Sequence, residues 1–226
     1  MTICIIPARS GSKRIKNKNI IKINGIPLIG LTIKIAKKSK LFKRIVVSTD
    51  SIKVAKIARE YGAEVPFLRS AKLSDDFTPT YKVLTDCVNR INSKKTSYHF
   101  CIYPASILIN KQDLSKAFTK MKKMKADFIC PIAKFESNPY RSLIIKKNFI
   151  KYNWPKYHMK RSQDLDNLYY DTGSFYIYKT SSLFQITKKM ILPKKSTYLI
   201  IKKKLIDVNY PEDLKTLKEH YNNKRK

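Results

Sequence analysis

TICIIPA, residues 2–8, is a short apolar run that stands directly before a loop of cations. β-branched residues in such a run are typical of a buried strand in a parallel sheet. The loop that follows, RSGSKRIKNKN at residues 9–19, therefore lies where the first strand of an α/β sheet would end. Ligands of open α/β sheets bind at the carboxyl ends of the strands, so this loop is the first candidate for a site.

The rest of the chain alternates strand-like with helical runs. Helical spacing covers 26–42, 52–61 and 112–124. The helix at 52–61 has Asp50 or Ser51 as its cap and Gly62 at its end. Strands are predicted at 44–50, 98–104, 126–132 and 173–180, and 211–221 reads as an ordinary helix start. This order predicts an α/β fold, a single domain over residues 1–226, with a mostly parallel sheet and helices on both faces.

Composition narrows the class of protein. The formal charge of +32 comes from 48 Lys and Arg against 16 Asp and Glu. A basic nucleic-acid-binding protein is therefore an alternative, but the cations are spread along the chain rather than clustered. No apolar run reaches the roughly 20 residues of a membrane span, and the first residues do not resemble a signal peptide, so we expect a cytoplasmic protein.

The cysteines and the opening loop leave different questions. The four widely spaced cysteines are expected to be reduced core thiols rather than metal ligands: Cys4, Cys87, Cys101 and Cys130.

The opening loop combines Arg and Lys with Gly11, one of five glycines, which suits close approach to a phosphate. It matches neither GxGxxG nor GxxxxGK[ST], and from spacing alone a solvated basic turn explains it equally well.

IPARSGSKRIKNKNI, residues 6–20, resembles the N-terminal signature of the cytidylyltransferases that activate nine-carbon acidic sugars, the CMP-sialic acid synthetase family. Three later blocks, at 46–80, 160–178 and 206–214, resemble the branch that handles pseudaminic acid. The resemblance implies a Rossmann-like nucleotidyltransferase fold. It also implies a reaction in which the sugar's anomeric hydroxyl attacks the α-phosphorus of CTP, giving a CMP-sugar for surface glycan or flagellin glycosylation and releasing pyrophosphate.

The resemblance assigns the opening loop to CTP. Arg9 and Lys13 are expected to bind phosphates and act in catalysis, Arg as a bidentate fork and Lys as a mobile charge. The nucleotide-binding residues that it implies are Ala8, Arg9, Gly11, Ser12, Lys13, Lys18, Asn19 and Arg69. Arg14 and Lys16 remain open between phosphate contact and solvated surface, and Asp75 and Asp76 can be solvated loop residues.

A divalent cation, Mg²⁺, is expected with CTP because it binds through carboxylates and phosphate oxygens. In the family the ligands resemble Asp-x-Asp, matched here by Asp207 and Asn209, and Asp207 is also expected to be catalytic. Asn209 brings no negative charge, so the metal would be held more weakly. The alternative for Asp207 is an ordinary residue before a helix.

The sugar end distinguishes the branches of the family. In the corresponding strand, sialic acid synthetases have a glutamine that helps to hold the sugar, and the resemblance places Tyr103 at that position here. Arg161 is expected to bind a carboxylate, and Gln163 and Asp164 are expected to bind hydroxyl or acetamido groups. The resemblance places three further residues on the pocket wall: Asp171, Phe175 and Tyr176. The alternation in SFYIY, residues 174–178, is equally typical of a half-buried strand.

Some alternatives remain at this level. The acid activated would be pseudaminic acid or, alternatively, legionaminic, N-acetylneuraminic or 3-deoxy-manno-octulosonic acid. A nucleotide-sugar-binding module without turnover would also fit the asparagine at position 209. The resemblance further implies a homodimer, in which a protrusion over about 134–171 forms part of the sugar pocket and reaches toward the partner.

Overall fold

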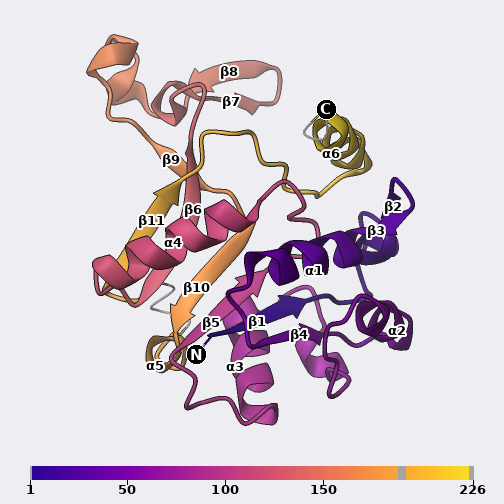
Figure 1. The fold of residues 1–226 in the computed structure, drawn as a ribbon. Helices are drawn as coiled ribbons and strands as arrows, with labels where there is room; N and C mark the ends of the chain where they lie inside the picture. Colours follow the sequence, from indigo (N-terminus) through magenta and orange to yellow (C-terminus); the bar gives the residue numbers. More distant parts are fainter. Residues whose placement is uncertain (1, 188–191, 224–226) are drawn as a thin grey trace.

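The structure is a computed structural model and describes residues 2–187 and 192–223. Its centre is a mixed sheet in the order β11-β6-β10-β5-β1-β4, with β9 pairing to β6 (Figure 1). The strands are β1 Thr2–Pro7, β4 Arg44–Ser48, β5 Tyr98–Ile102, β6 Phe128–Lys134, β9 Tyr169–Asp171, β10 Phe175–Lys179 and β11 Ser196–Ile200. β1 runs parallel to β4 and β5, and β11 runs parallel to β6, whereas β10 is antiparallel to both of its neighbours.

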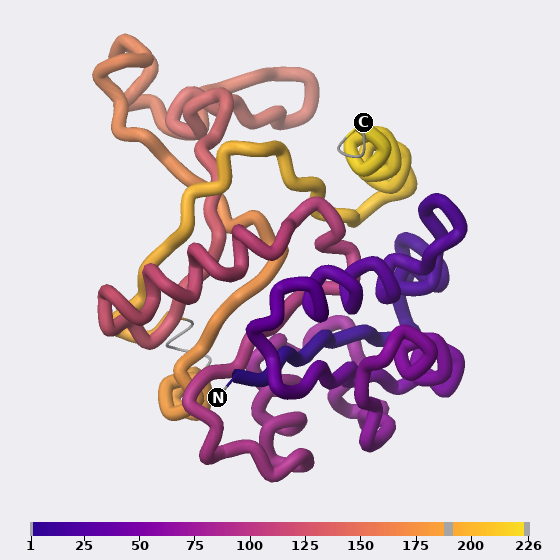
Figure 2. Tube along the Cα trace, in the orientation of Figure 1, coloured from indigo at the N-terminus to yellow at the C-terminus, as the bar shows by residue number. Residues whose placement is uncertain are grey.

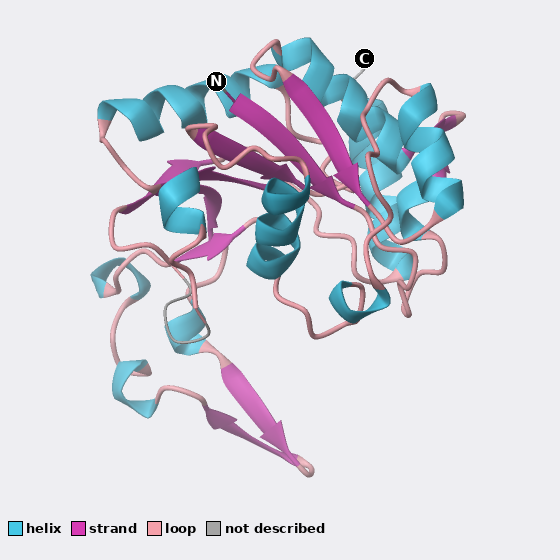
Figure 3. Ribbon diagram, turned by 90° about the horizontal axis from the view of Figure 1, so that it is seen from below, coloured by secondary structure: helices cyan, strands magenta, loops and turns pink. Residues whose placement is uncertain are grey.

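Helices cover both faces of this sheet, as Figure 3 shows. They are α1 Leu28–Ser39, α2 Ile52–Glu60, α3 Thr80–Arg90, α4 Lys111–Lys123, α5 Thr180–Leu183 and α6 Pro211–Asn223. Alternate residues of β1 serve the two faces: Cys4 and Ile6 pack with α1, α2 and α4, while Ile3 and Ile5 pack with α3 and α5. This two-residue period is the property of a strand buried on both sides, and it confirms the predicted α/β fold.

Local signals explain where the elements begin and end. Ser51, not Asp50, caps α2, because its side chain accepts from the backbone N–H of Val54. Gly62 follows that helix with φ at +83°, a left-handed conformation that favours glycine. All four cysteines are free; Cys4, Cys87 and Cys101 are buried in the core as predicted, whereas Cys130 is only half-buried.

Residues between β6 and β9 leave the main sheet and form a separate protrusion. It contains a hairpin of β7 Leu143–Lys146 and β8 Phe149–Tyr152, followed by short 3-10 turns. Figures 1 and 2 show this segment extending away from the layered body, at the top of the view. A protrusion in the predicted place is therefore present. Two smaller strands, β2 Lys22–Ile23 and β3 Ile26–Pro27, form another hairpin before α1.

The topology brings distant loops to one edge of the sheet. β1, β4 and β5 are mutually parallel, so the loops that follow them emerge on the same side. The carboxyl end of β6 and the start of β10 lie next to them through the β10–β5 pairing. No helix within the described ranges is long and apolar enough to cross a membrane.

Candidate active site

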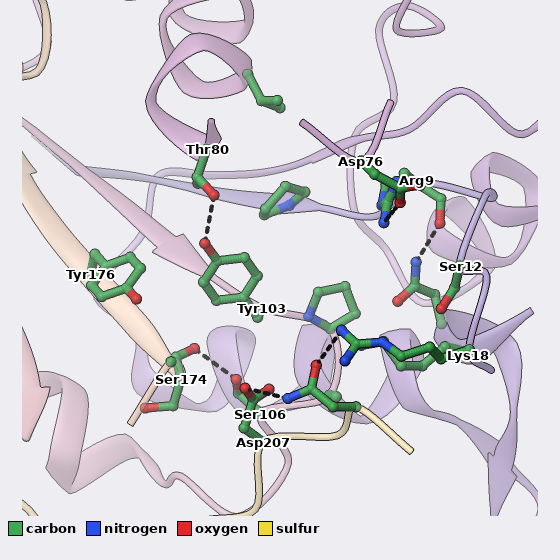
Figure 4. A pocket seen from close by; sticks show the side chains of 18 of the residues that line it. Arg9, Ser12, Lys18, Asp76, Thr80, Tyr103, Ser106, Ser174, Tyr176 and Asp207 are labelled. Carbon is green, nitrogen blue, oxygen red and sulfur yellow. Dashed lines mark hydrogen bonds and ion pairs between the residues drawn. The ribbon is translucent and has the colours of Figure 1, made fainter. Parts of the chain in front are cut away.

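A cavity of about 690 Å³ opens at the carboxyl ends of β1 and β5 (Figure 4). Five segments far apart in the sequence supply its lining: the opening loop, 69–83, 103–109, 172–176 and 205–209. Ten of the residues expected at the site line this cavity: Arg9, Ser12, Lys13, Lys18, Asn19, Arg69, Tyr103, Tyr176, Asp207 and Asn209. The tertiary structure thus gathers into one cavity residues from three separate groups of expectations.

The two cations expected at phosphate both reach one carboxylate. Arg9 Nη2 lies 2.5 Å from Asp76 Oδ1, and Lys13 Nζ lies 2.8 Å from Asp76 Oδ2. The hydrogen bonds from Lys13 and Arg9 lower the pKa of Asp76 below its ordinary value. Asp76 is therefore not a freely solvated loop residue, because two cations of the opening loop bind its carboxylate.

Side chains behind the opening loop fix its shape. The buried Asn19 donates from Nδ2 to the carbonyl oxygen of Arg9 at 2.8 Å. Ser10 donates from its backbone N and its Oγ to the two carboxylate oxygens of Asp50, at 2.8 and 2.7 Å. Asn19 and Asp50 thereby hold the start of the loop against the sheet. A β-carbon added at Gly11 would meet no atom within 4 Å, so packing within the chain does not require glycine there.

Arg69 and Ala8 lie below the surface of the cavity. Arg69 is 5% exposed and donates from Nε to Ser74 Oγ at 3.0 Å. Desolvation by burial lowers its pKa, although the side chain remains a cation at neutral pH. Ala8 is fully buried after β1 and does not line the cavity, so any ligand contact from Ala8 would come through its backbone.

The opposite side of the cavity is aromatic. Tyr103 and Tyr176 meet edge to face, with ring centroids 5.8 Å apart, and Figure 4 shows them across the pocket from Arg9. Tyr103 Oη lies 2.7 Å from Thr80 Oγ1, and Tyr176 Oη donates to Asp171 Oδ2 at 2.6 Å. Burial is the main cause of the raised pKa of both tyrosines, which keeps their hydroxyls neutral. Asp171 itself lies behind Tyr176 and outside the cavity lining.

Besides Asp171, four of the residues expected at the sugar do not line the cavity. Phe175 is fully buried in the core cluster on the α1 and α4 side, because alternation along β10 turns it away from the face that carries Tyr176. Its expected position on the pocket wall is therefore wrong. Arg161 and Asp164 pair with each other at 2.7 Å on the exposed protrusion, and Gln163 is exposed beside them.

Three hydroxyl-bearing residues that the sequence analysis missed also line the cavity: Ser106, Thr172 and Ser174. Ser106 donates from Oγ to the carbonyl oxygen of Ser174 at 2.7 Å, and Thr172 Oγ1 lies 2.9 Å from Ser174 Oγ. Figure 4 places Ser106 and Ser174 near Asp207. The signal that could have found Thr172 and Ser174 is their position in the turn before SFYIY, where small polar residues flank Gly173.

The segment expected at the metal is held by contacts from three directions. Val208 is fully buried, and its carbonyl oxygen accepts a 2.7 Å hydrogen bond from Lys18 Nζ. Desolvation is the main cause of the lowered pKa of Lys18, and it outweighs the opposing effect of Asp207. Asp213 Oδ2 accepts from the backbone N–H of Asn209 at 2.7 Å. Lys18 therefore binds the protein's own backbone between the two candidate metal ligands.

Side chains of this segment form a chain of hydrogen bonds with the opening loop. Arg14 Nη2 donates to Asn209 Oδ1 at 2.9 Å, and Asn209 Nδ2 donates to Asp207 Oδ2 at 2.7 Å. Among the residues that the structure describes, no group of three His, Cys, Asp or Glu side chains is arranged to hold a metal. A cation at this site would therefore need ligands from a bound molecule as well as from Asp207.

Comparisons with known proteins show which sequences this chain resembles. The family model described as Cytidylyltransferase matches residues 3–222. The chain is 34% identical over 222 residues to the pseudaminic acid cytidylyltransferase of Campylobacter jejuni, covering 97% of this chain and 95% of that protein. It is 30% identical over 201 residues to the CMP-N,N'-diacetyllegionaminic acid synthase of Legionella pneumophila, covering 87% and 82%.

A solved structure extends the comparison to the fold. The CMP:2-keto-3-deoxy-manno-octonic acid synthetase complexed with CTP matches this structure with a TM-score of 0.74. The match covers 99% of both chains at 13% identity, so it shows a shared fold. Together with the matched family model and the full-length relative, it identifies this chain as a member of the cytidylyltransferase family and as a nucleotidyltransferase enzyme.

Proposed function

We propose that this enzyme transfers CMP from CTP to the anomeric hydroxyl of pseudaminic acid and releases pyrophosphate. The observation that carries the proposal is that one cavity joins the cationic opening loop to an aromatic wall and to Asp207. Its support in sequence is the relative of that activity, which matches over 97% of this chain. The new bond forms between the sugar oxygen and the α-phosphorus, while the bond from that phosphorus to the pyrophosphate oxygen breaks.

Arg9 and Lys13 would bind the phosphates of CTP. Both already hold the carboxylate of Asp76, and phosphate oxygens have the same charge and similar hydrogen-bonding geometry. A triphosphate would take over these donors and would stabilise the negative charge that develops on the leaving pyrophosphate. Arg69 lies close enough to the same cavity to support the nucleotide from below, and Ser12 and Lys18 line it beside the loop.

Mg²⁺ fits this site as a companion of CTP rather than as a resident ion. Asp207 offers a carboxylate at the cavity, and a triphosphate would provide the remaining anionic oxygens. When bound, the ion would neutralise phosphate charge and orient the α-phosphorus. The chain's own part is to hold Asp207 and the opening loop on the same side of the cavity, which Lys18 does by bonding to Val208.

The sugar would lie against the aromatic side of the cavity. Tyr103 and Tyr176 offer an apolar surface, while Ser106 and Ser174 stand near enough to meet polar groups. An acidic sugar with acetamido groups presents both kinds of surface. Arg161, Gln163 and Asp164 would contribute only if the protrusion moved or belonged to a partner subunit.

A homodimer is part of the same proposal. The protrusion exposes large apolar side chains, among them Ile145, Phe149, Ile150 and Met159, each more than two thirds exposed. An apolar surface of this kind on a projecting hairpin suits contact with a second copy of the chain. Sedimentation equilibrium tests it: the double variant Ile145→Glu with Phe149→Glu should sediment as a monomer, and unchanged mass would reject this surface as the interface.

The activity is tested by pyrophosphate release from CTP and Mg²⁺ with a panel of acidic sugars. Pseudaminic acid should give the highest kcat/KM, and legionaminic, N-acetylneuraminic and 3-deoxy-manno-octulosonic acids should give less. A higher value for legionaminic acid would keep the reaction but replace the proposed substrate. No pyrophosphate with any acid, together with tight salt-sensitive binding to RNA or DNA, would favour the nucleic-acid alternative.

A further inference from the structure

We infer that Asn209 is not a second metal ligand but a positioning residue, which links the guanidinium of Arg14 to the carboxylate of Asp207. The inference rests on the proposed CTP- and Mg²⁺-dependent transfer and concerns how this chain prepares Asp207 for it. This role for Asn209 differs from the expectation drawn from the sequence, in which Asn209 and Asp207 were both ligands of one cation.

Hydrogen-bond chemistry fixes which way the Asn209 amide points. A guanidinium can only donate, and an ionised carboxylate can only accept. Arg14 Nη2 lies 2.9 Å from one end of the amide, and Asp207 Oδ2 lies 2.7 Å from the other. The end facing Arg14 must therefore be the oxygen and the end facing Asp207 must be the NH₂ group. The opposite orientation would set two donors against each other and two acceptors against each other.

This orientation removes Asn209 from the set of metal ligands. The amide oxygen is the atom of asparagine that can bind a hard cation, and here it accepts from Arg14. A cation placed at that oxygen would also lie beside the positive charge of the guanidinium. A cation and the Arg14 guanidinium would therefore compete for the same amide oxygen, which in this structure is bound to Arg14.

The surroundings keep this chain of contacts in place. The guanidinium of Arg14 lies over the ring of Tyr210, 5.0 Å from its centroid. Asp213 Oδ2 accepts from the backbone N–H groups of both Asn209 and Tyr210, each at 2.7 Å. Asp213 thus holds the backbone of Asn209, and Tyr210 packs against the guanidinium that contacts its amide.

Asp207 gains orientation from this arrangement. Asn209 engages Oδ2, which leaves Oδ1 of the carboxylate as the ligand atom for a cation carried by CTP. Partners of this kind, behind a metal ligand, commonly fix its direction and tune its affinity. In this inference Arg14 acts on Asp207 through Asn209, which gives Arg14 a role that the sequence left open.

The test measures cation binding without turnover. Mn²⁺ with CTP, in the absence of any acidic sugar, is titrated with protein, and water proton relaxation reports the complex. Four proteins form a cycle: the wild type, Arg14→Met, Asn209→Ala and the double variant. Methionine keeps an unbranched stem that can still pack on Tyr210 but cannot donate to the amide.

The two roles for Asn209 predict different cycles. For a positioning residue, Asn209→Ala weakens Mn²⁺·CTP binding about 10-fold in the wild type. The same change costs less than about 2-fold in the Arg14→Met background, because the chain is already broken. If Asn209 is instead a metal ligand, Asn209→Ala weakens Mn²⁺·CTP binding in the Arg14→Met background at least as much as in the wild type, because the amide oxygen is then free to bind the cation. This result would overturn the inference.

A matched control and one further outcome complete the design. Lys16→Met removes a cation from the same loop whose side chain is exposed and does not line the cavity, and it should change binding by less than about 2-fold. Thermal unfolding of each variant checks that it is folded. If the wild type binds CTP but takes up no Mn²⁺, the metal proposal fails and the inference fails with it. If the effects of the two substitutions on Mn²⁺·CTP binding simply add, the inference alone is wrong.

Discussion

Replacing Arg9 with alanine should reduce pyrophosphate release far more than replacing Lys13. The Arg9 side chain is 34% exposed and the Lys13 side chain is 81% exposed, although both reach Asp76. A charge-assisted hydrogen bond at a partly desolvated site contributes about 1.5–3 kcal/mol, whereas an exposed ion pair contributes about 0.2–1 kcal/mol. We therefore expect kcat/KM to fall about 100-fold for Arg9→Ala and about 5-fold for Lys13→Ala.

The assay is continuous pyrophosphate detection with CTP and sugar varied in turn. Lys16→Ala serves as the matched control, because Lys16 is an exposed cation of the same loop that does not line the cavity. Its kcat/KM should stay within about 2-fold of the wild type, because solvent and salt screen an exposed charge that does not line the cavity. If Arg9→Ala keeps near-normal activity, or if Lys16→Ala loses as much, the opening loop is not a phosphate site.

Three further outcomes follow from single residues. His99 is fully buried and desolvation lowers its pKa to about 4, so the unfolded state binds a proton before the folded state does as pH falls. The unfolding free energy should therefore drop by about 3 kcal/mol between pH 6.5 and 4, and denaturant melts of His99→Gln should show a weaker dependence of that free energy on pH. Gly30→Ala should lower the unfolding free energy by about 1–3 kcal/mol, because its β-carbon would lie 2.8 Å from the Tyr61 ring; a variant as stable as the wild type would contradict this packing. Tyr103→Phe removes the bond to Thr80 and should raise the KM for the sugar about 3- to 10-fold while leaving the KM for CTP unchanged, and a shift in the CTP value instead would move Tyr103 to the nucleotide side.

The sequence predicted much of the fold because local patterns carry it. The apolar run at 2–8, the helical spacing at 52–61 and the glycine at 62 all report backbone requirements that neighbouring residues express by themselves. The strand at 196–200 was missed, since its exposed edge position breaks the apolar run into alternating residues. The helix at 80–90 was also missed, because it begins after a proline without a side-chain cap.

What the sequence by itself determined is the α/β order of elements, the cationic loop after the first strand and the likeness to a family. Tertiary structure decided which charges meet: Asp76 reaches Arg9 and Lys13 across more than sixty residues, and Asn209 joins Arg14 to Asp207 across nearly two hundred. Periodicity tells which residues share a face of a strand, but it does not tell which face looks into a cavity. Partners for polar side chains are set by chain segments that meet only when the sheet is assembled, and the local pattern contains no record of them.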